Sequence, residues 1–218
     1  MVGTSGQVGR RADHRRRPDH AGRAGLLAPA HARRTPHAVR LNSRAVAGTP
    51  RKITVAGDPV LHQVTRPVSS FDAELGTLVD DMFASMKVAE GVGLAAPQVG
   101  VDLAVFVYDC PDSEGVRHVG HVVNPTIEVS GPPDLHEEGC LSVPGPYHDL
   151  ERASVATVRG VDRDGVPVEV TGTGYFARCL QHETDHLKGV LFIDHLPRNR
   201  RRRVLREMEP YEWNAPVP

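Results

Sequence analysis

His182, Glu183 and His186 form an H-E-x-x-H pattern in a segment, residues 175–189, whose apolar residues recur at helical spacing. Gly189 follows the last of them, as glycine often does where a helix ends. Side chains four positions apart on a helix project from one face, about 6 Å apart along the axis. The pattern therefore predicts two imidazole ligands for one metal ion, with Glu183 placed to act on water there. The rest of the chain must fold so that a third ligand reaches this helix.

Three cysteines are candidates for the third ligand. Cys179 precedes His186 by seven residues, about 10.5 Å along a straight helix, so a metal with bonds of about 2.1 to 2.3 Å cannot reach both. We therefore expect Cys179 in the core or in a pocket. Cys110 lies in the acidic sequence DCPDSEG, which we expect to be a loop that leaves the thiol solvated. Cys140 follows Gly139, where the backbone can bend, and is the favoured ligand.

The fold class that the periodicity predicts is α+β. Apolar residues at helical spacing predict an amphipathic helix over residues 71–90. Strand-like runs separated by turn sequences follow, at residues 103–108, 119–124, 126–130, 154–162 and 166–172. The sequence DRDG, residues 162–165, predicts a hairpin between the last two runs. We expect antiparallel β-sheets packed around a central helix that carries H-E-x-x-H, with the second amphipathic helix near the start of the domain.

The charge is distributed unevenly along the chain. Residues 1–50 hold ten arginines and two acidic residues, so they carry +8 and the remainder carries −9, for a total of −1. This segment also lacks periodicity. We therefore expect a disordered Arg-rich extension over residues 1–49, a folded domain over residues 50–197 and a basic C-terminal helix or tail over residues 198–218. The acidic remainder argues against DNA as a specific partner.

Composition also bears on the compartment. No apolar run approaches the roughly 20 residues that span a bilayer, so we expect no membrane association. An odd number of cysteines without C-x-x-C pairs is typical of a reducing compartment. The Arg-rich extension has only two serines, Ser5 and Ser43, whereas organelle transit peptides are rich in serine. These features favour a bacterial cytoplasm over an organelle.

The sequence GVGLAAPQVG, residues 91–100, matches the dinucleotide-binding pattern G-x-G-x-x-A but lacks its context. That fingerprint lies between a strand and a helix, whereas here a predicted helix precedes it and Pro97 follows. We therefore expect no nucleotide cofactor. The glycines instead allow the backbone to approach a ligand closely, with Gln98 as a nearby amide donor.

Three segments in this order, GVGLAAPQ, EGCLS and QHETDHLKG, resemble the signature motifs of the peptide deformylase family. The resemblance covers residues 50–197 and makes that domain catalytic. It implies one divalent metal ion held by Cys140, His182 and His186, with water in the fourth position. Fe²⁺ is the ion that the resemblance implies in the cell, with Zn²⁺, Ni²⁺ or Co²⁺ tolerated, because the ligand set by itself does not select iron.

The implied reaction is hydrolysis of the N-formyl group from the N-terminal formylmethionine of newly synthesised polypeptides. Gln98 and the backbone N–H of Leu141 would hold the developing oxyanion, and Glu183 would carry the proton from water to the leaving nitrogen. Gly93 and Gly139 would approach the substrate backbone. By their position on the H-E-x-x-H helix, the candidates for lining a methionine pocket are Tyr175, Phe176 and Cys179.

Two features lie outside the family pattern. Tyr147 stands where many bacterial members carry an arginine near the substrate, which leaves the recognition of a substrate carbonyl open. The basic sequence PRNRRRRVLREMEP predicts either a solvated helix or a contact with ribosomal RNA.

The H-E-x-x-H pattern also occurs in other classes of metal site. A zinc endopeptidase uses H-E-x-x-H too, but takes its third ligand downstream and leaves EGCLS unexplained. A purely structural metal site requires four protein ligands, whereas we find three and a glutamate that can act on water. The downstream candidates for the endopeptidase are Asp194, His195, Glu207 and Glu209.

Overall fold

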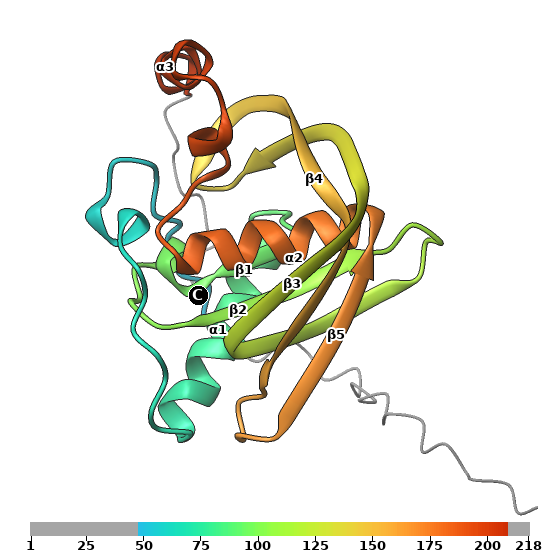
Figure 1. The fold of residues 1–218 in the computed structure, drawn as a ribbon. Helices are drawn as coiled ribbons and strands as arrows, with labels where there is room; N and C mark the ends of the chain where they lie inside the picture. Colours follow the sequence, from blue (N-terminus) through green and yellow to red (C-terminus); the bar gives the residue numbers. More distant parts are fainter. Residues whose placement is uncertain (1–47, 209–218) are drawn as a thin grey trace, which may run out of the picture. The chain divides into compact units, whose positions relative to one another are not determined.

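The computed structural model describes residues 48–208, and five strands in this range form one antiparallel sheet in the order β1-β2-β3-β4-β5 (Figure 1). The strands are β1 (Gly93–Ala95), β2 (Val105–Pro111), β3 (Arg117–Cys140), β4 (Val143–Val161) and β5 (Pro167–Thr173). The predicted α+β class is confirmed, with one sheet where more than one was expected. The predictions for residues 1–47 and 209–218 lie outside the described residues, and the predicted domain boundaries stay predictions.

Strands β3 and β4 are longer than the predicted runs. β3 joins residues 119–124 and 126–130 across a register shift between Val123 and Thr126. It then continues to Cys140 through a polar sequence that contains two prolines. Local propensity does not predict a strand there, so pairing with β4 accounts for the extended backbone. The two strands pair up to Cys140 and Val143, which lie opposite each other.

The predicted hairpin at residues 162–165 is confirmed. The backbone N–H of Asp162 donates to the carbonyl of Val166 at 2.8 Å, and Gly165 adopts a φ of 80°. The side chain of Asp162 accepts from the backbone N–H groups of Asp164 and Val166 at 2.9 Å each. A left-handed glycine at the end of a three-residue loop is usual in such hairpins.

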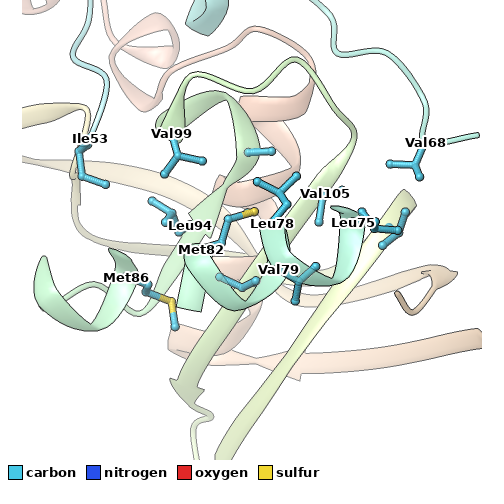
Figure 2. Packing of buried hydrophobic residues seen from close by; sticks show 13 residues of the cluster. Ile53, Val68, Leu75, Leu78, Val79, Met82, Met86, Leu94, Val99 and Val105 are labelled. Atoms are coloured by element: carbon cyan, nitrogen blue, oxygen red, sulfur yellow. The ribbon is translucent and has the colours of Figure 1, made fainter. Parts of the chain in front are cut away.

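Helix α1 (Ala73–Val88) agrees with the predicted helix to within two residues at each end. Asp72 caps it by accepting hydrogen bonds from the backbone N–H groups of Glu74 and Leu75. Its apolar face packs against β1 and β2, where Figure 2 shows the cluster that includes Met82, Leu94 and Val105. Members of this cluster that α1 contributes are Leu75, Leu78, Val79, Met82 and Met86.

Helix α2 (Gly174–Leu187) runs across the sheet and contacts all five strands (Figure 1). Gly174, with a φ of 53°, turns the chain from β5 into the helix, and Gly189, with a φ of 72°, follows its end. The H-E-x-x-H residues lie on this helix. Three short 3₁₀ turns occur along the chain: η1 (Pro59–His62) before α1, η2 (Ala96–Val99) after β1 and η3 (Phe192–His195) after α2. Helix α3 (Arg198–Glu207) follows η3. None of the helices in residues 48–208 has the length and apolar character needed to cross a bilayer.

The expectation for Cys110 is wrong. This residue lies on β2 rather than in a loop, and its exposed fraction is 0%. Strand β2 extends through Pro111, which pairs with Arg117 of β3. Side chains alternate between the two faces of a strand, so Cys110 points into the core while Asp109 pairs with Arg117 at the surface. The acidic residues indicated a loop, but the turn that holds Asp112 and Glu114 begins only after Pro111, so Cys110 is still within the strand.

Candidate metal centre

The structure brings Cys140, His182 and His186 together. One possible ligand atom from each lies within 4.8 Å of the others, and within residues 48–208 no other three histidine, cysteine or acidic side chains are so arranged. The Sγ of Cys140 lies 3.3 Å from Nε2 of His186, which lies 3.2 Å from Nε2 of His182. The helical spacing accounts for the two imidazoles, and the end of β3 supplies the thiol.

A short turn after β3 holds Cys140 in place. The backbone N–H of Ser142 donates to the Cys140 Sγ at 3.4 Å, and the Ser142 carbonyl accepts from the N–H of Ala56 at 2.7 Å. The segment before α1 therefore stabilises this turn through the hydrogen bond from Ala56. The three donor atoms, one sulfur and two imidazole nitrogens, suit a transition metal or zinc.

Glu138 orients His182, and the sequence interpretation missed it. Its carboxylate lies 2.7 Å from Nδ1 of His182, so it holds the proton on Nδ1 and leaves Nε2 free as a ligand. Burial alone would raise the pKa of Glu138, but hydrogen bonds from His182 and Arg152 outweigh it and hold the pKa well below its usual range. The acid directly before Gly139-Cys140 was the available signal.

Two buried arginines neutralise this carboxylate. Arg152 on β4 donates to both oxygens of Glu138, at 2.8 and 3.1 Å, and Arg178 on α2 donates at 2.9 Å. Arg152 also contacts Asp185 at 2.6 Å, and His195 lies 2.9 Å from the same Asp185 oxygen. The charged groups around the metal position thus form a network that runs from His182 to the beginning of the C-terminal segment.

Glu183 lies beside this cluster with 3% of its surface exposed. Burial raises the pKa of its carboxyl group to about 7. Its Oε2 atom is buried and has no hydrogen-bond partner within the described part of the chain. A carboxyl group that titrates near neutrality and keeps a free oxygen suits proton transfer.

Position 93 requires a glycine because its backbone lies close to side chains of α2. A Cβ atom at this position would lie 2.3 Å from the Glu183 carboxylate and 2.9 Å from the Cys179 sulfur. The glycine loop was expected to approach a substrate, and here it also leaves room for Glu183. Any larger residue would displace that carboxyl group.

Gln98 lies at the same site with 1% of its surface exposed. Its Oε1 accepts from the Ala95 backbone N–H at 2.8 Å, which fixes the orientation of the amide. The Nε2 group lies 3.6 Å from the Cys140 sulfur and 3.3 Å from the Ser142 hydroxyl. Gln98 therefore directs a donor toward the metal position.

A cavity of about 330 Å³ opens at the cluster. Of the residues that we expected to bind substrate, it is lined by Gly93, Gly139, Tyr175 and Cys179, and also by Gln98 and Leu141. Phe176 does not line it, so this prediction is wrong: the ring is fully buried and stacks on His118, with centroids 4.5 Å apart. Consecutive residues of a helix point about 100° apart, which turns Phe176 into the core while Tyr175 faces the cavity.

The aromatic ring of Tyr147 covers Gly139 at the cavity wall. A Cβ on Gly139 would come within 2.4 Å of that ring, whose residue is 67% exposed. Arg152, by contrast, is buried in the Glu138 network. Position 147 therefore carries an aromatic ring where the family pattern has an arginine, and the arginine at position 152 is not exposed to the cavity.

The downstream residues considered for an endopeptidase have other partners. His195 contacts Asp185, Asp194 contacts Arg201 at 2.9 Å, and Glu207 contacts Arg203 at 2.7 Å. None of these three belongs to the ligand cluster. Glu209 lies outside the described residues.

The family model described as polypeptide deformylase matches residues 50–202. Peptide deformylase 1 of Streptomyces avermitilis is 57% identical over 175 residues, which cover 78% of this chain and 81% of that protein. The peptide deformylase of Mycolicibacterium paratuberculosis is 49% identical over 177 residues, which cover 75% of this chain and 90% of that protein.

Solved structures agree with the sequence relatives. A peptide deformylase from Legionella pneumophila matches with a TM-score of 0.68 and 45% identity, over 73% of this chain and 94% of that one. The peptide deformylase from Ehrlichia chaffeensis in complex with actinonin matches with a TM-score of 0.69 and 34% identity, over 72% and 95% of the two chains.

Proposed function

The chain belongs to the polypeptide deformylase family, and from this premise we propose roles for the residues of its metal centre. As an enzyme of this family, it hydrolyses the N-formyl group from the N-terminal formylmethionine of new polypeptides and releases formate. The observation that carries the proposed roles is the meeting of Cys140, His182 and His186 beside the buried carboxyl group of Glu183.

The donor set fits a divalent metal ion, on which enzymes of this family depend. One thiolate and two neutral imidazoles are good ligands for Fe²⁺, Zn²⁺, Ni²⁺ or Co²⁺. We propose Cys140, His182 and His186 as the protein ligands and Fe²⁺ as the ion in the cell. Bound there, the ion would supply Lewis-acid activation of a water molecule.

The chain's own residues would then move the proton and stabilise charge. Glu183 takes a proton from the attacking water and returns it to the leaving nitrogen, a role supported by its pKa near neutrality and its free Oε2 atom. Gln98 donates its amide N–H to the oxyanion that develops on the formyl oxygen, and the backbone N–H of Leu141 is the second donor. Each such donor contributes about 3 to 4 kcal/mol in the transition state.

The cavity beside the cluster would receive the methionine side chain. Tyr175 and Cys179 line it, and its volume of about 330 Å³ is ample for one such side chain. Gly93 and Gly139 would let the substrate backbone pass close to the metal position. Tyr147 offers its ring in place of a charged group, so we expect it to contact the peptide by packing.

Two further proposals concern the surroundings of the enzyme. Helix α3 carries exposed arginines, including Arg202 and Arg203, and this supports a contact between the C-terminal segment and ribosomal RNA. A co-sedimentation with ribosomes that weakens steeply with salt and disappears on deletion of residues 198–206 would support the contact. Co-sedimentation unchanged by the deletion would contradict it. The bacterial relatives support a cytoplasmic enzyme.

The deciding experiment is deformylation of formyl-Met-Ala by protein prepared anaerobically with Fe²⁺. We expect formate release, with casein left intact in a parallel incubation. Casein cleavage without formate release would instead favour the endopeptidase interpretation.

A further inference from the structure

Arg178 is a buried arginine on α2, one helical turn before His182, and it has no role in the chemistry proposed above. Only 4% of its side chain is exposed. Its guanidinium donates to Glu138 at 2.9 Å, to the Leu150 carbonyl at 2.8 Å and to the Asp134 carbonyl at 2.7 Å. Burying a guanidinium is unfavourable unless such contacts offset the loss of hydration.

The Glu138 carboxylate is saturated with donors. Its Oε1 atom receives His182 at 2.7 Å and Arg152 at 2.8 Å, while its Oε2 atom receives Arg152 at 3.1 Å and Arg178 at 2.9 Å. An ionised carboxylate offers about four acceptor sites, so none is left over. Together with Arg152, Arg178 holds the oxygen that does not contact His182, which opposes rotation of the carboxylate away from the imidazole.

The two arginines differ in how their charge is shared. Arg152 also donates to Asp185 at 2.6 Å, so two carboxylates compete for its guanidinium. Within residues 48–208, Arg178 has Glu138 as its single carboxylate partner, and its other two bonds go to backbone carbonyls. Those carbonyls belong to β3 and β4, so Arg178 fixes Glu138 relative to the sheet that also carries Cys140.

We propose that Arg178 is a positioning residue of the metal centre. It acts through Glu138, which keeps the proton of His182 on Nδ1 and turns Nε2 toward the metal position. This inference rests on the proposed function, because it assumes that Cys140, His182 and His186 hold the metal. Groups that orient a ligand imidazole commonly change metal affinity 10-fold to 100-fold when they are removed.

The first test is metal binding by Arg178→Met, which keeps most of the side-chain volume and removes the charge. We expect the Kd for Co²⁺, measured by chelator competition on metal-free protein, to rise about tenfold. The visible absorption of the Co²⁺-loaded protein should shift, because the geometry of the imidazole changes. Arg178→Lys keeps the positive charge but not the three directed bonds, so its Kd should lie between those of Arg178→Met and wild type.

A matched control is Arg51→Met. Arg51 makes a two-bond contact with Asp81 of α1, at 2.8 and 2.9 Å, away from the metal centre. Its loss should leave the Co²⁺ Kd and spectrum unchanged. If Arg178→Met does not fold, Arg178→Gln, which keeps a donor for one of the carbonyls but lacks the charge, takes its place.

The decisive comparison is a double-mutant cycle with Glu138→Gln. If Arg178 acts through Glu138, then Arg178→Met in the Glu138→Gln background should not weaken Co²⁺ binding further. An equal loss in both backgrounds would mean that Arg178 only supports the fold, and would overturn the proposal, as would an unchanged Kd in Arg178→Met. Failure of the wild-type protein to bind one equivalent of Co²⁺ would overturn the metal centre itself, so the two failures can be told apart.

Discussion

Helices α1 and α2 are both largely buried, but α2 buries many more polar side chains than α1 does. Helix α1 contributes mainly apolar residues to a cluster shared with β1 and β2 (Figure 2). Helix α2 also packs on the sheet, yet its buried residues include Arg178, Gln181, His182, Glu183, Thr184 and His186. Burial of the α1 face stabilises the fold directly, by roughly 25 cal/mol for each Å² removed from water.

Burial on α2 requires partners from elsewhere in the chain. Glu138 on β3 and Arg152 on β4 supply charges to it, and Gln181 bonds the backbone of Ala153 through both ends of its amide. A buried polar group without such partners would destabilise the fold. Folding alone accounts for the buried face of α1, whereas the buried polar groups of α2 are accounted for only if they also serve chemistry.

The largest effect should come from Glu183, whose Oε2 atom has no hydrogen-bond partner among residues 48–208. Glu183→Gln should lower the rate of formate release about 1000-fold, because it removes the group that transfers the proton. Metal content should not change, and thermal stability should not fall, because the variant no longer buries an ionisable group there. Formate release within tenfold of wild type would mean that Glu183 is not the proton carrier.

On α1 the expected effect is on stability and not on chemistry. Met82 has an exposed fraction of 0%, so Met82→Ala leaves a cavity in the cluster and should lower the free energy of unfolding by about 3 kcal/mol. Urea unfolding measures this change. The kcat/KM of the folded variant should stay within about twofold, and a large loss of activity at full folding would show that α1 also shapes the site.

His121 is a titratable group that packs against Phe83 of α1. Burial lowers the pKa of His121 to about 4 from its ordinary 6.5, with the Arg163 charge acting in the same direction. The unfolded chain therefore binds a proton that the folded chain resists, and stability is lost as pH falls from about 6.5 toward 4. The depressed pKa corresponds to about 2 kcal/mol at pH 5.

The test is His121→Gln, which removes the titration. Urea unfolding at pH 7 and pH 5 should show a smaller loss for the variant than for wild type. The other charged groups around His121 are Asp80, Asp162 and Asp164, which the variant leaves unchanged. Equal losses in the two proteins would contradict the prediction.

The smallest expected effect is on the free energy of unfolding, and it differs between the start of α1 and the start of α2. Asp72 accepts two backbone hydrogen bonds at the start of α1, so Asp72→Ala should reduce the free energy of unfolding by about 1 kcal/mol. Thr173 precedes α2 but its side chain makes no capping bond, and its hydroxyl instead lies 2.7 Å from the Ser113 hydroxyl at the surface, so Thr173→Ala should cost only about 0.5 kcal/mol. Chemical denaturation of the two variants checks this order. A larger loss from Thr173→Ala would show that α2 depends on its start as much as α1 does.

Prediction from sequence was most successful where structure is local. The helix at residues 71–90 and the hairpin at residues 162–165 depend on periodicity and turn chemistry, and both are confirmed. It was wrong at Cys110, because the acidic residues that follow it do form a turn, but β2 extends through Pro111 before that turn begins. It was also wrong at Phe176, because position on a helix does not tell which of two adjacent side chains faces a cavity.

The sequence by itself determined that His182 and His186 share one face of a helix and that Cys179 lies too far from His186 to bind the same metal ion. These follow from helix geometry and bond lengths, which act over a few residues. Only the tertiary structure decided that Glu138, Arg152 and Arg178 surround the metal position, because β3, β4 and α2 bring them together. Strand pairing over long separations in sequence leaves no local signal, and a buried carboxylate can be recognised only after its partners are seen around it.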